Sequence, residues 1–188
     1  SAITFLPALG ATFIFLTTGS LKNIEKNSIN VALFTSMLTF FLTIFLWFKF
    51  DFQSPEFQFV EQKNWIKGFV KFKFGIDGIS LLLIILTTFI VPISIASVAL
   101  SIKSRMKEFL IAILILETFM IGVFCSLDLV IFYLFFEGGL IPMFLIIGIW
   151  GGEKRVYSAF KFFLFTLLGS VFMLIAIISI YWIMGTTD

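Results

Sequence analysis

The chain has 188 residues, of which 60% are hydrophobic and 13% are charged, with a formal net charge of +2. A soluble domain carries about a quarter of charged residues, so this composition indicates a membrane protein, and the small net charge gives no basis for nucleic-acid binding. The absence of His and the single Cys exclude a haem, iron–sulfur or zinc site, a Ser-His-Asp arrangement and an intrachain disulfide. Cys125 ends an apolar run and is expected to be a packing residue.

Six apolar runs have the length of membrane-spanning helices, since about 20 apolar residues cross roughly 30 Å of hydrocarbon. In chain order they are 2–18, 29–48, 79–102, 109–125, 129–150 and 162–184. The first run has no basic start and no cleavage site, which argues against a signal peptide. The sequence therefore predicts an all-α polytopic transmembrane helix bundle of about six spans. Because the chain starts without Met and stops after a helix, we expect it to be cut at both ends.

The basic residues of the short connections lie on one side of the predicted membrane. The connections after the first, third and fifth spans hold Lys22, Lys26, Lys103, Arg105, Lys107, Lys154, Arg155 and Lys161. The basic residues of the other side all fall in one long connection, residues 49–78, which also contains acidic residues. Because short basic loops face the cytoplasm or the matrix, we expect the N-terminus to lie outside.

The long outer connection, between the second and third spans, alternates apolar and polar residues in two stretches. These stretches are 56–61 and 70–74, and Lys63 and Asn64 lie between them near the expected turn. A short β-hairpin on the membrane surface fits this pattern. An irregular amphipathic loop with Trp65 at the interface fits it equally well.

Two acidic side chains fall well inside predicted spans, Glu117 in the fourth and Glu137 in the fifth. An ionised group at the bilayer centre costs at least about 2.5 kcal/mol, so each is a functional candidate. The turn between these antiparallel spans is expected at 126–128, which puts both acids about 15 Å below it. Two acids at matching depth could share a proton or pass one on, as in a relay. The structural alternative is a glutamate hydrogen-bonded to a Ser or Thr of another helix.

The residues that follow Glu137 predict a helix that other groups can approach closely. Pro142 has no N–H, so the carbonyl of Gly138 loses its usual helical partner. Gly138 and Gly139 leave room for a neighbouring helix or for water. Lys161, at the start of the sixth span, is a third candidate for proton transfer, and its alternative role is an interfacial anchor.

Three segments resemble the M-type subunit, also called chain 4, of respiratory NADH–quinone oxidoreductase, an antiporter-like subunit of complex I. They are FGIDGISLLLIILTTF (74–89), CSLDLVIFYLFFEGGLIPMFLIIGIWGG (125–152) and KFFLFTLLGSVFMLIAI (161–177), and the most specific block is FFEGGLIPMF followed by WGG. Family members are much longer, so the resemblance implies an N-terminal fragment of one membrane domain. It implies that residues 1–107 hold the first three spans and that 108–188 begin the antiporter-like proton-channel repeat.

The resemblance implies a proton-translocating subunit of NADH:quinone oxidoreductase, a translocase, with no cofactor or metal in this chain. NADH, flavin, iron–sulfur clusters and quinone react in other subunits of such complexes. Glu137 stands at the position of the family's essential fifth-helix glutamate, whose lysine partner lies on a later helix, beyond Asp188. The expected partners are other membrane subunits, especially neighbouring antiporter-like ones, and the lipid bilayer. The expected location is a bacterial plasma membrane or a mitochondrial inner membrane.

The sequence departs from the family at two places and leaves two other functions open. Relatives often have bulkier residues, or Ser or Ala, where Gly138 and Gly139 stand, and only some have Glu117. A subunit of a multisubunit sodium–proton antiporter would share the helix plan and the buried glutamate. A purely structural membrane anchor would share the helices but leave Glu137 without a role.

Overall fold

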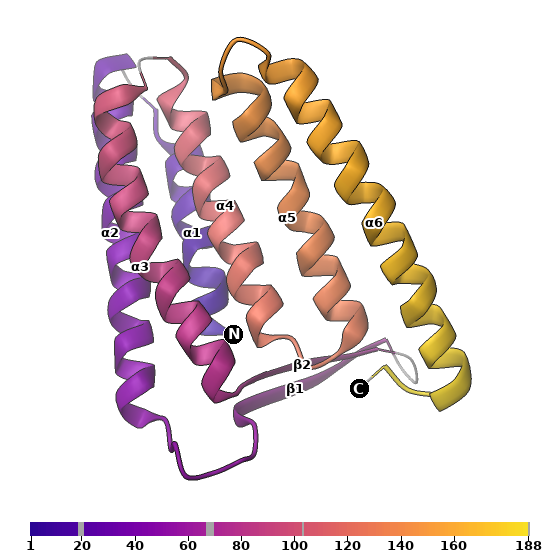
Figure 1. Cartoon of the computed structure of the whole chain (residues 1–188). Helices are drawn as coiled ribbons and strands as arrows, with labels where there is room; N and C mark the ends of the chain where they lie inside the picture. Colours follow the sequence, from indigo (N-terminus) through magenta and orange to yellow (C-terminus); the bar gives the residue numbers. More distant parts are fainter. Residues whose placement is uncertain (19–20, 67–69, 103, 188) are drawn as a thin grey trace.

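Six helices and one β-hairpin make up the described part of the chain, which comprises residues 1–18, 21–66, 70–102 and 104–187 of this computed structural model (Figure 1). Within it, the side chains of 21–22, 64–66, 70–71 and 99–101 are not described. The elements are α1 (Ala2–Leu16), α2 (Leu21–Lys49), β1 (Gln58–Ile66), β2 (Val70–Ile76), α3 (Gly78–Ser101), α4 (Met106–Cys125), α5 (Leu129–Trp150) and α6 (Arg155–Met184).

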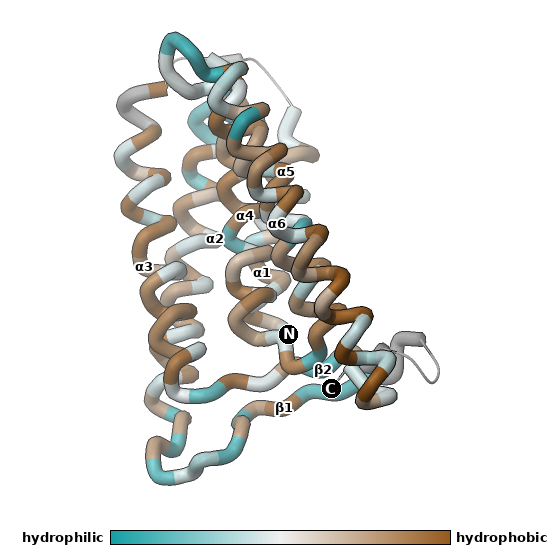
Figure 2. The backbone as a smooth tube through the Cα atoms, turned by 45° about the vertical axis from the view of Figure 1, so that its right-hand side comes forward, coloured by the Kyte–Doolittle hydropathy of each residue, from teal (hydrophilic) through white to brown (hydrophobic). Residues whose placement is uncertain are grey.

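Five of these helices, α2 to α6, are long and apolar enough to cross a membrane. The apolar α1 has 15 residues, a length of about 22 Å, and is shorter than the hydrocarbon layer is thick. Hydrophobic residues occupy the middle of the bundle, and hydrophilic residues gather towards its two ends (Figure 2). The predicted all-α bundle of about six spans is thus confirmed, with a short first helix.

Two helices begin earlier than their apolar runs predicted. The helix α2 begins at Leu21 instead of residue 29, and α6 begins at Arg155 instead of residue 162. Hydropathy detects the apolar part of a helix, whereas backbone hydrogen bonding continues into its polar flank. Lys161 therefore lies almost two turns inside α6 instead of at its start, which corrects its predicted place.

The helix α4 is central, because it packs on α1, α2, α3 and α5, while α6 packs on α5 at the edge of the bundle (Figure 1). Buried apolar side chains fill the bundle in two clusters. One lies at the hairpin end and includes Leu81, Ile84 and Ile121, and the other includes Ile14, Ile95, Leu110 and Leu114. The outer face of α6 is apolar and exposed, with Phe165 81% and Trp182 87% exposed. Such a face requires lipid or further protein around it.

The hairpin of β1 and β2 lies across one end of the bundle and confirms the hairpin alternative for the outer connection (Figure 1). The turn expected near Lys63 and Asn64 lies further along the chain, because these two residues pair with Phe72 and Lys71 inside the sheet. A polar pair within a strand looks like a turn in the sequence. The strands are joined at 67–69, which lie outside the described residues, as does Lys103.

The hairpin is fixed to the bundle through the connection between α4 and α5. The N–H of Leu127 donates to the carbonyl of Lys73 at 3.0 Å, and the side chain of Phe74 is 2% exposed. A Cβ at Gly75 would lie 2.6 Å from Cδ1 of Leu127, so glycine lets this leucine side chain pack on the hairpin without moving. The turn predicted at 126–128 is confirmed by these contacts.

Two basic residues at the opposite end cap helices. The Nζ of Lys107 donates to the carbonyls of Phe15 and Thr17 at 2.9 and 3.0 Å, at the end of α1. The Nη1 of Arg155 donates to the carbonyl of Ile149 at 2.7 Å, near the end of α5. A cation at a helix C-terminus satisfies free carbonyls and opposes the negative end of the helix dipole.

Candidate functional site

Glu117 lies in the middle of α4 and is 1% exposed. Both of its carboxyl oxygens are buried, and neither has a hydrogen-bond partner among the described residues. Phe119 and Gly122 of the same helix face α5, because Phe119 fills the space at Gly138 and Phe135 fills the space at Gly122. At 100° per residue these positions put Glu117 on the far side of α4 from α5. There it lines a cavity between α3 and α4.

Glu137 lies on the face of α5 that packs against α6. The ring of Phe144 lies 5.4 Å from the ring of Phe163, and Gly148 approaches Ala159, with 3.5 Å between the two Cβ positions. Glu137 precedes Phe144 by seven residues and Gly148 by eleven, which places it between them around the helix, about 20° from each. Its side chain is partly buried, and within the described part of the chain its Oε2 is buried without a hydrogen-bond partner.

The buried face of α6 brings a hydroxyl to the height of Glu137. Counting along the antiparallel helices from the contact between Gly148 and Ala159 places Glu137 level with Ser170. Ser170 is 2% exposed, and its Oγ donates to the carbonyl of Leu167 at 2.9 Å. This hydroxyl bonds back to its own helix, so Ser170 does not supply the Ser or Thr partner that the structural alternative requires.

The two acids lie at nearly the same depth but do not face each other. The packing of Phe119 on Gly138 puts Glu117 level with Leu140, three residues or about 4.5 Å from the height of Glu137. Their side chains point to opposite sides, Glu117 towards α3 and Glu137 towards α6. Depth follows from the residue count to the turn, whereas direction follows from the rotation of each helix. The two acids are therefore not placed to share a proton directly.

Lys161 is not brought to either acid. Ala159 is buried against α5, and Lys161 follows two residues later, about 200° around α6. Its side chain is exposed, with Nζ 5.9 Å from the centre of the Tyr157 ring. Along the helix it lies nine residues, or about 13 Å, from Ser170. This arrangement fits an anchor at the end of the bundle better than a partner of Glu137.

The glycines next to Glu137 differ in what they contact. A Cβ at Gly138 would lie 2.5 Å from Cε1 of Phe119, so the absence of a side chain there lets α4 approach. A Cβ at Gly139 would lie 3.6 Å from Cβ of Phe119, an ordinary contact. Pro142 is buried within α5, which stays helical from Leu129 to Trp150. Pro142 has no N–H to donate to the carbonyl of Gly138, but the helix continues unbroken past this position.

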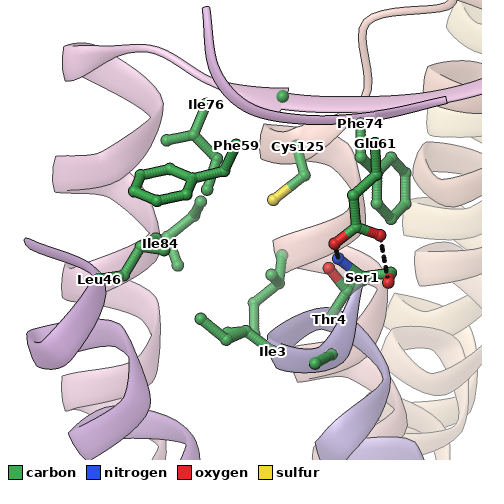
Figure 3. A pocket seen from close by; sticks show the side chains of 13 residues that line it. Ser1, Ile3, Thr4, Leu46, Phe59, Glu61, Phe74, Ile76, Ile84 and Cys125 are labelled. Carbon is green, nitrogen blue, oxygen red and sulfur yellow. Dashed lines mark hydrogen bonds and ion pairs between the residues drawn. The ribbon is translucent and has the colours of Figure 1, made fainter. Parts of the chain in front are cut away.

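A second cavity, of about 200 Å³, lies under the hairpin (Figure 3). Glu61 accepts hydrogen bonds there from the hydroxyl and the ammonium of Ser1, at 2.5 and 3.2 Å. The bond from the Ser1 hydroxyl holds the pKa of Glu61 below its ordinary value. Cys125 is a free thiol, 6% exposed, and belongs to the apolar cluster at this end, as expected of a packing residue.

Asp128 is a structural residue that the sequence analysis missed. It is 1% exposed, and its Oδ1 accepts from the N–H groups of Val130 and Ile131 at 2.9 and 3.3 Å. Its Oδ2 accepts from the hydroxyl of Thr187 at 2.6 Å, which ties the segment after α6 to the start of α5. An Asp directly before an apolar run is a signal for a helix N-cap and could have identified it.

The side chains that could bind a metal or a proton are scattered over the described residues. No three of their His, Cys, Asp or Glu side chains are grouped so as to hold a metal ion. Buried acids without partners can bind and release a proton when their surroundings change. Both oxygens of Glu117 and the Oε2 of Glu137 are buried without a hydrogen-bond partner among the described residues, on separate faces of the bundle.

Comparison with known proteins gives matches along the whole chain. Residues 126–188 match the family described as NADH:quinone oxidoreductase/Mrp antiporter, transmembrane. The whole chain is 53% identical to NADH-quinone oxidoreductase subunit M of Rhodobacter capsulatus, of which it covers 36%. It is 47% identical, again over its whole length, to NADH-ubiquinone oxidoreductase chain 4 of Marchantia polymorpha, of which it covers 38%.

The fold has a solved counterpart in respiratory complex I from Thermus thermophilus with bound NADH. The TM-score is 0.81 at 28% identity, over 98% of this chain and 36% of that chain. The chain thus spans about a third of the length of the relatives that it matches. With five membrane-length apolar helices and these bacterial and mitochondrial-type relatives, it is a multi-pass inner-membrane protein. Along its whole length this chain is homologous to the M-type, or chain 4, antiporter-like subunits of NADH–quinone oxidoreductase.

Proposed function

We propose that this chain is part of a proton-translocating membrane subunit of an NADH:quinone oxidoreductase, with Glu137 as a protonatable relay residue. The observation that carries the proposal is the buried, unpartnered Oε2 of Glu137, in a helix within the segment that matches the antiporter-type family. Quinone reduction occurs elsewhere in the complex, and this chain takes part through its protonatable side chains.

The relay works by charge coupling at Glu137. In a site of low dielectric a carboxylic acid holds its proton unless a cation lies nearby. A cation that approaches the α6-facing side of α5 would release the proton, and its withdrawal would let the acid take one up again. Lys161 points away from this face, so the cation comes from outside the described helices. We expect a lysine of a later helix of the subunit to supply it.

The proposed subunit has a defined orientation and place in the complex. The start of α2 and the ends of α3 and α5, with their basic connections, lie at one end of the bundle, and the hairpin lies at the other (Figure 1). The basic residues of the short connections gather at the end opposite the hairpin, and this distribution supports an N-terminus outside. The exposed apolar face of α6 is available to the rest of the subunit, in which residues 108–188 begin the channel repeat. Neighbouring antiporter-like subunits are the expected partners.

The test is Glu137→Gln in the complete complex, with Glu153→Gln as a matched control. Glu153 is an exposed glutamate in the connection between α5 and α6, so its substitution makes the same chemical change outside the bundle. We expect E137Q to lose NADH-driven proton pumping and quinone reduction while the complex still assembles, and E153Q to retain both. Normal pumping by an assembled E137Q complex would show that the relay assignment is wrong.

A second candidate is a subunit of a multisubunit sodium–proton antiporter, because the matching family description covers both classes. The two functions differ in their driving reaction. Membranes that contain an antiporter exchange sodium for protons without NADH, whereas the proposed complex pumps when NADH is oxidised. Deleting the gene for this chain should abolish NADH-driven pumping, and the loss of sodium–proton exchange alone would favour the antiporter. Neighbouring genes for other complex I subunits would also favour the oxidoreductase.

A further inference from the structure

The carboxyl group of Glu117 is buried on a face of α4 that the proposed relay does not use. The side chain is 1% exposed and both oxygens lack partners among the described residues. A buried polar group without a hydrogen bond costs about 1–3 kcal/mol. An apolar residue of similar size would avoid this cost, so an acid at this position points to a hydrogen-bonding group in the space that its side chain borders.

That space is a cavity of about 330 Å³ between α3 and α4. It is lined by α3 from Leu83 to Ser94 and by α4 from Ile113 to Phe124. Among its lining residues Glu117 is the one ionisable group, and the other polar side chains are the hydroxyls of Thr87 and Ser94. The cavity has room for several water molecules, each of which needs two to four polar partners to be held.

The three polar side chains lie at different heights along the cavity, with Glu117 between the two hydroxyls. Because the helices are antiparallel and line the cavity over matching stretches, Glu117 lies level with Ile90. Thr87 is then about 4.5 Å to one side along the helix axis, and Ser94 is about 6 Å to the other. The hydroxyl of Thr87 donates to the carbonyl of Leu83 at 2.8 Å and can still accept.

Other occupants fit this cavity less well. Acyl chains of lipids carry no hydrogen-bond donor and would leave both oxygens of Glu117 unsatisfied. A metal ion such as Ca²⁺ takes about six to eight oxygen ligands, and the lining offers one carboxylate and two hydroxyls. A proton on Glu117 needs one carboxyl oxygen, and a water beside it can use the second oxygen and the hydroxyls of the lining.

We propose that Glu117 is a second proton-binding site, reached by water in the cavity between α3 and α4 and separate from Glu137. A proton arrives through water, binds one carboxyl oxygen and leaves by the same water, with no other bond made or broken. Its use in translocation rests on the proposed function, but the binding of the proton at Glu117 does not.

The protonation of Glu117 is tested by labelling the assembled complex with dicyclohexylcarbodiimide. This reagent adds to a protonated carboxylic acid in an apolar site, and the whole reagent stays on the side chain as an N-acylurea. Mass spectrometry of the Glu117 peptide should show the adduct, and it should persist when Glu137→Gln is introduced. Absence of the adduct, or its loss in E137Q, would overturn a separate proton site. Failure of the Glu137 relay instead appears as normal pumping in E137Q, so the two outcomes are distinguishable.

The water in the cavity is tested with two adjacent cysteine variants, Ser94→Cys and Ile93→Cys. Ser94 lines the cavity, whereas Ile93 is 54% exposed on the outer side of α3 at nearly the same depth. A charged methanethiosulfonate reacts with a thiolate, and a thiolate forms only where water reaches the sulfur. We expect S94C to be modified and I93C to be spared in the membrane-embedded complex. Equal resistance of the two variants would mean a dry cavity and would refute the proposal.

Discussion

Replacing Gly138 by alanine would place a methyl group 2.5 Å from Cε1 of Phe119, well inside contact distance. The ring of Phe119 has little freedom to move, because the ring of Phe135 packs against it at 6.2 Å. Overpacking of this kind costs about 1–3 kcal/mol, and the better helix propensity of alanine returns only about 0.5–1 kcal/mol. At Gly139 the added methyl would lie at 3.6 Å from Cβ of Phe119, an ordinary contact. This substitution therefore has no overpacking cost and keeps the benefit of alanine's helix propensity.

The two variants therefore form a matched pair, in which G138A should be about 1–3 kcal/mol less stable than G139A. The measurement is the thermal midpoint at which the subunit leaves the purified complex, for both variants and the unaltered protein. We expect G139A to match or exceed the unaltered protein and G138A to fall below both. Phe119→Leu should restore part of the loss in the G138A background. Equal midpoints for G138A and G139A would mean that α4 and α5 do not pack in the described register.

Two further predictions concern helix caps. Asp128→Ala should lower the stability of the subunit by about 0.5–2 kcal/mol because it removes the N-cap of α5, whereas Thr187→Val, which leaves that cap, should lower the same thermal midpoint less. Hydrogen bonds from Ser80 hold the pKa of Asp77 below its ordinary 3.8. The stability that Asp77 gives to the start of α3 is therefore complete above pH 3.8, and it is lost as the pH falls through the lower pKa of the folded protein. Amide exchange at the start of α3 should show this acid loss, and Asp77→Asn should not; an identical acid profile in D77N would contradict the assignment.

The limits of a span could be predicted from the sequence where the helix begins and ends together with its apolar run. The fifth span, 129–150, coincides with α5, because Asp128 and Gly151 bound a run that is apolar apart from Glu137. The starts of α2 and α6 were missed, because their first turns are polar and hydropathy has no signal for a solvated helical turn. The hairpin was one of two open alternatives, since period-two alternation does not distinguish a strand from an extended loop until a partner strand is present.

The sequence by itself determined the membrane class, the order of the spans and the depth of the two buried acids. These properties follow from local composition and from residue counts to the nearest turn, so no long-range contact is needed to obtain them. Only the tertiary structure decided that Glu117 faces α3 and Glu137 faces α6. That outcome depends on how α4 and α5 are rotated about their axes when Phe119 packs on Gly138, which no local pattern specifies.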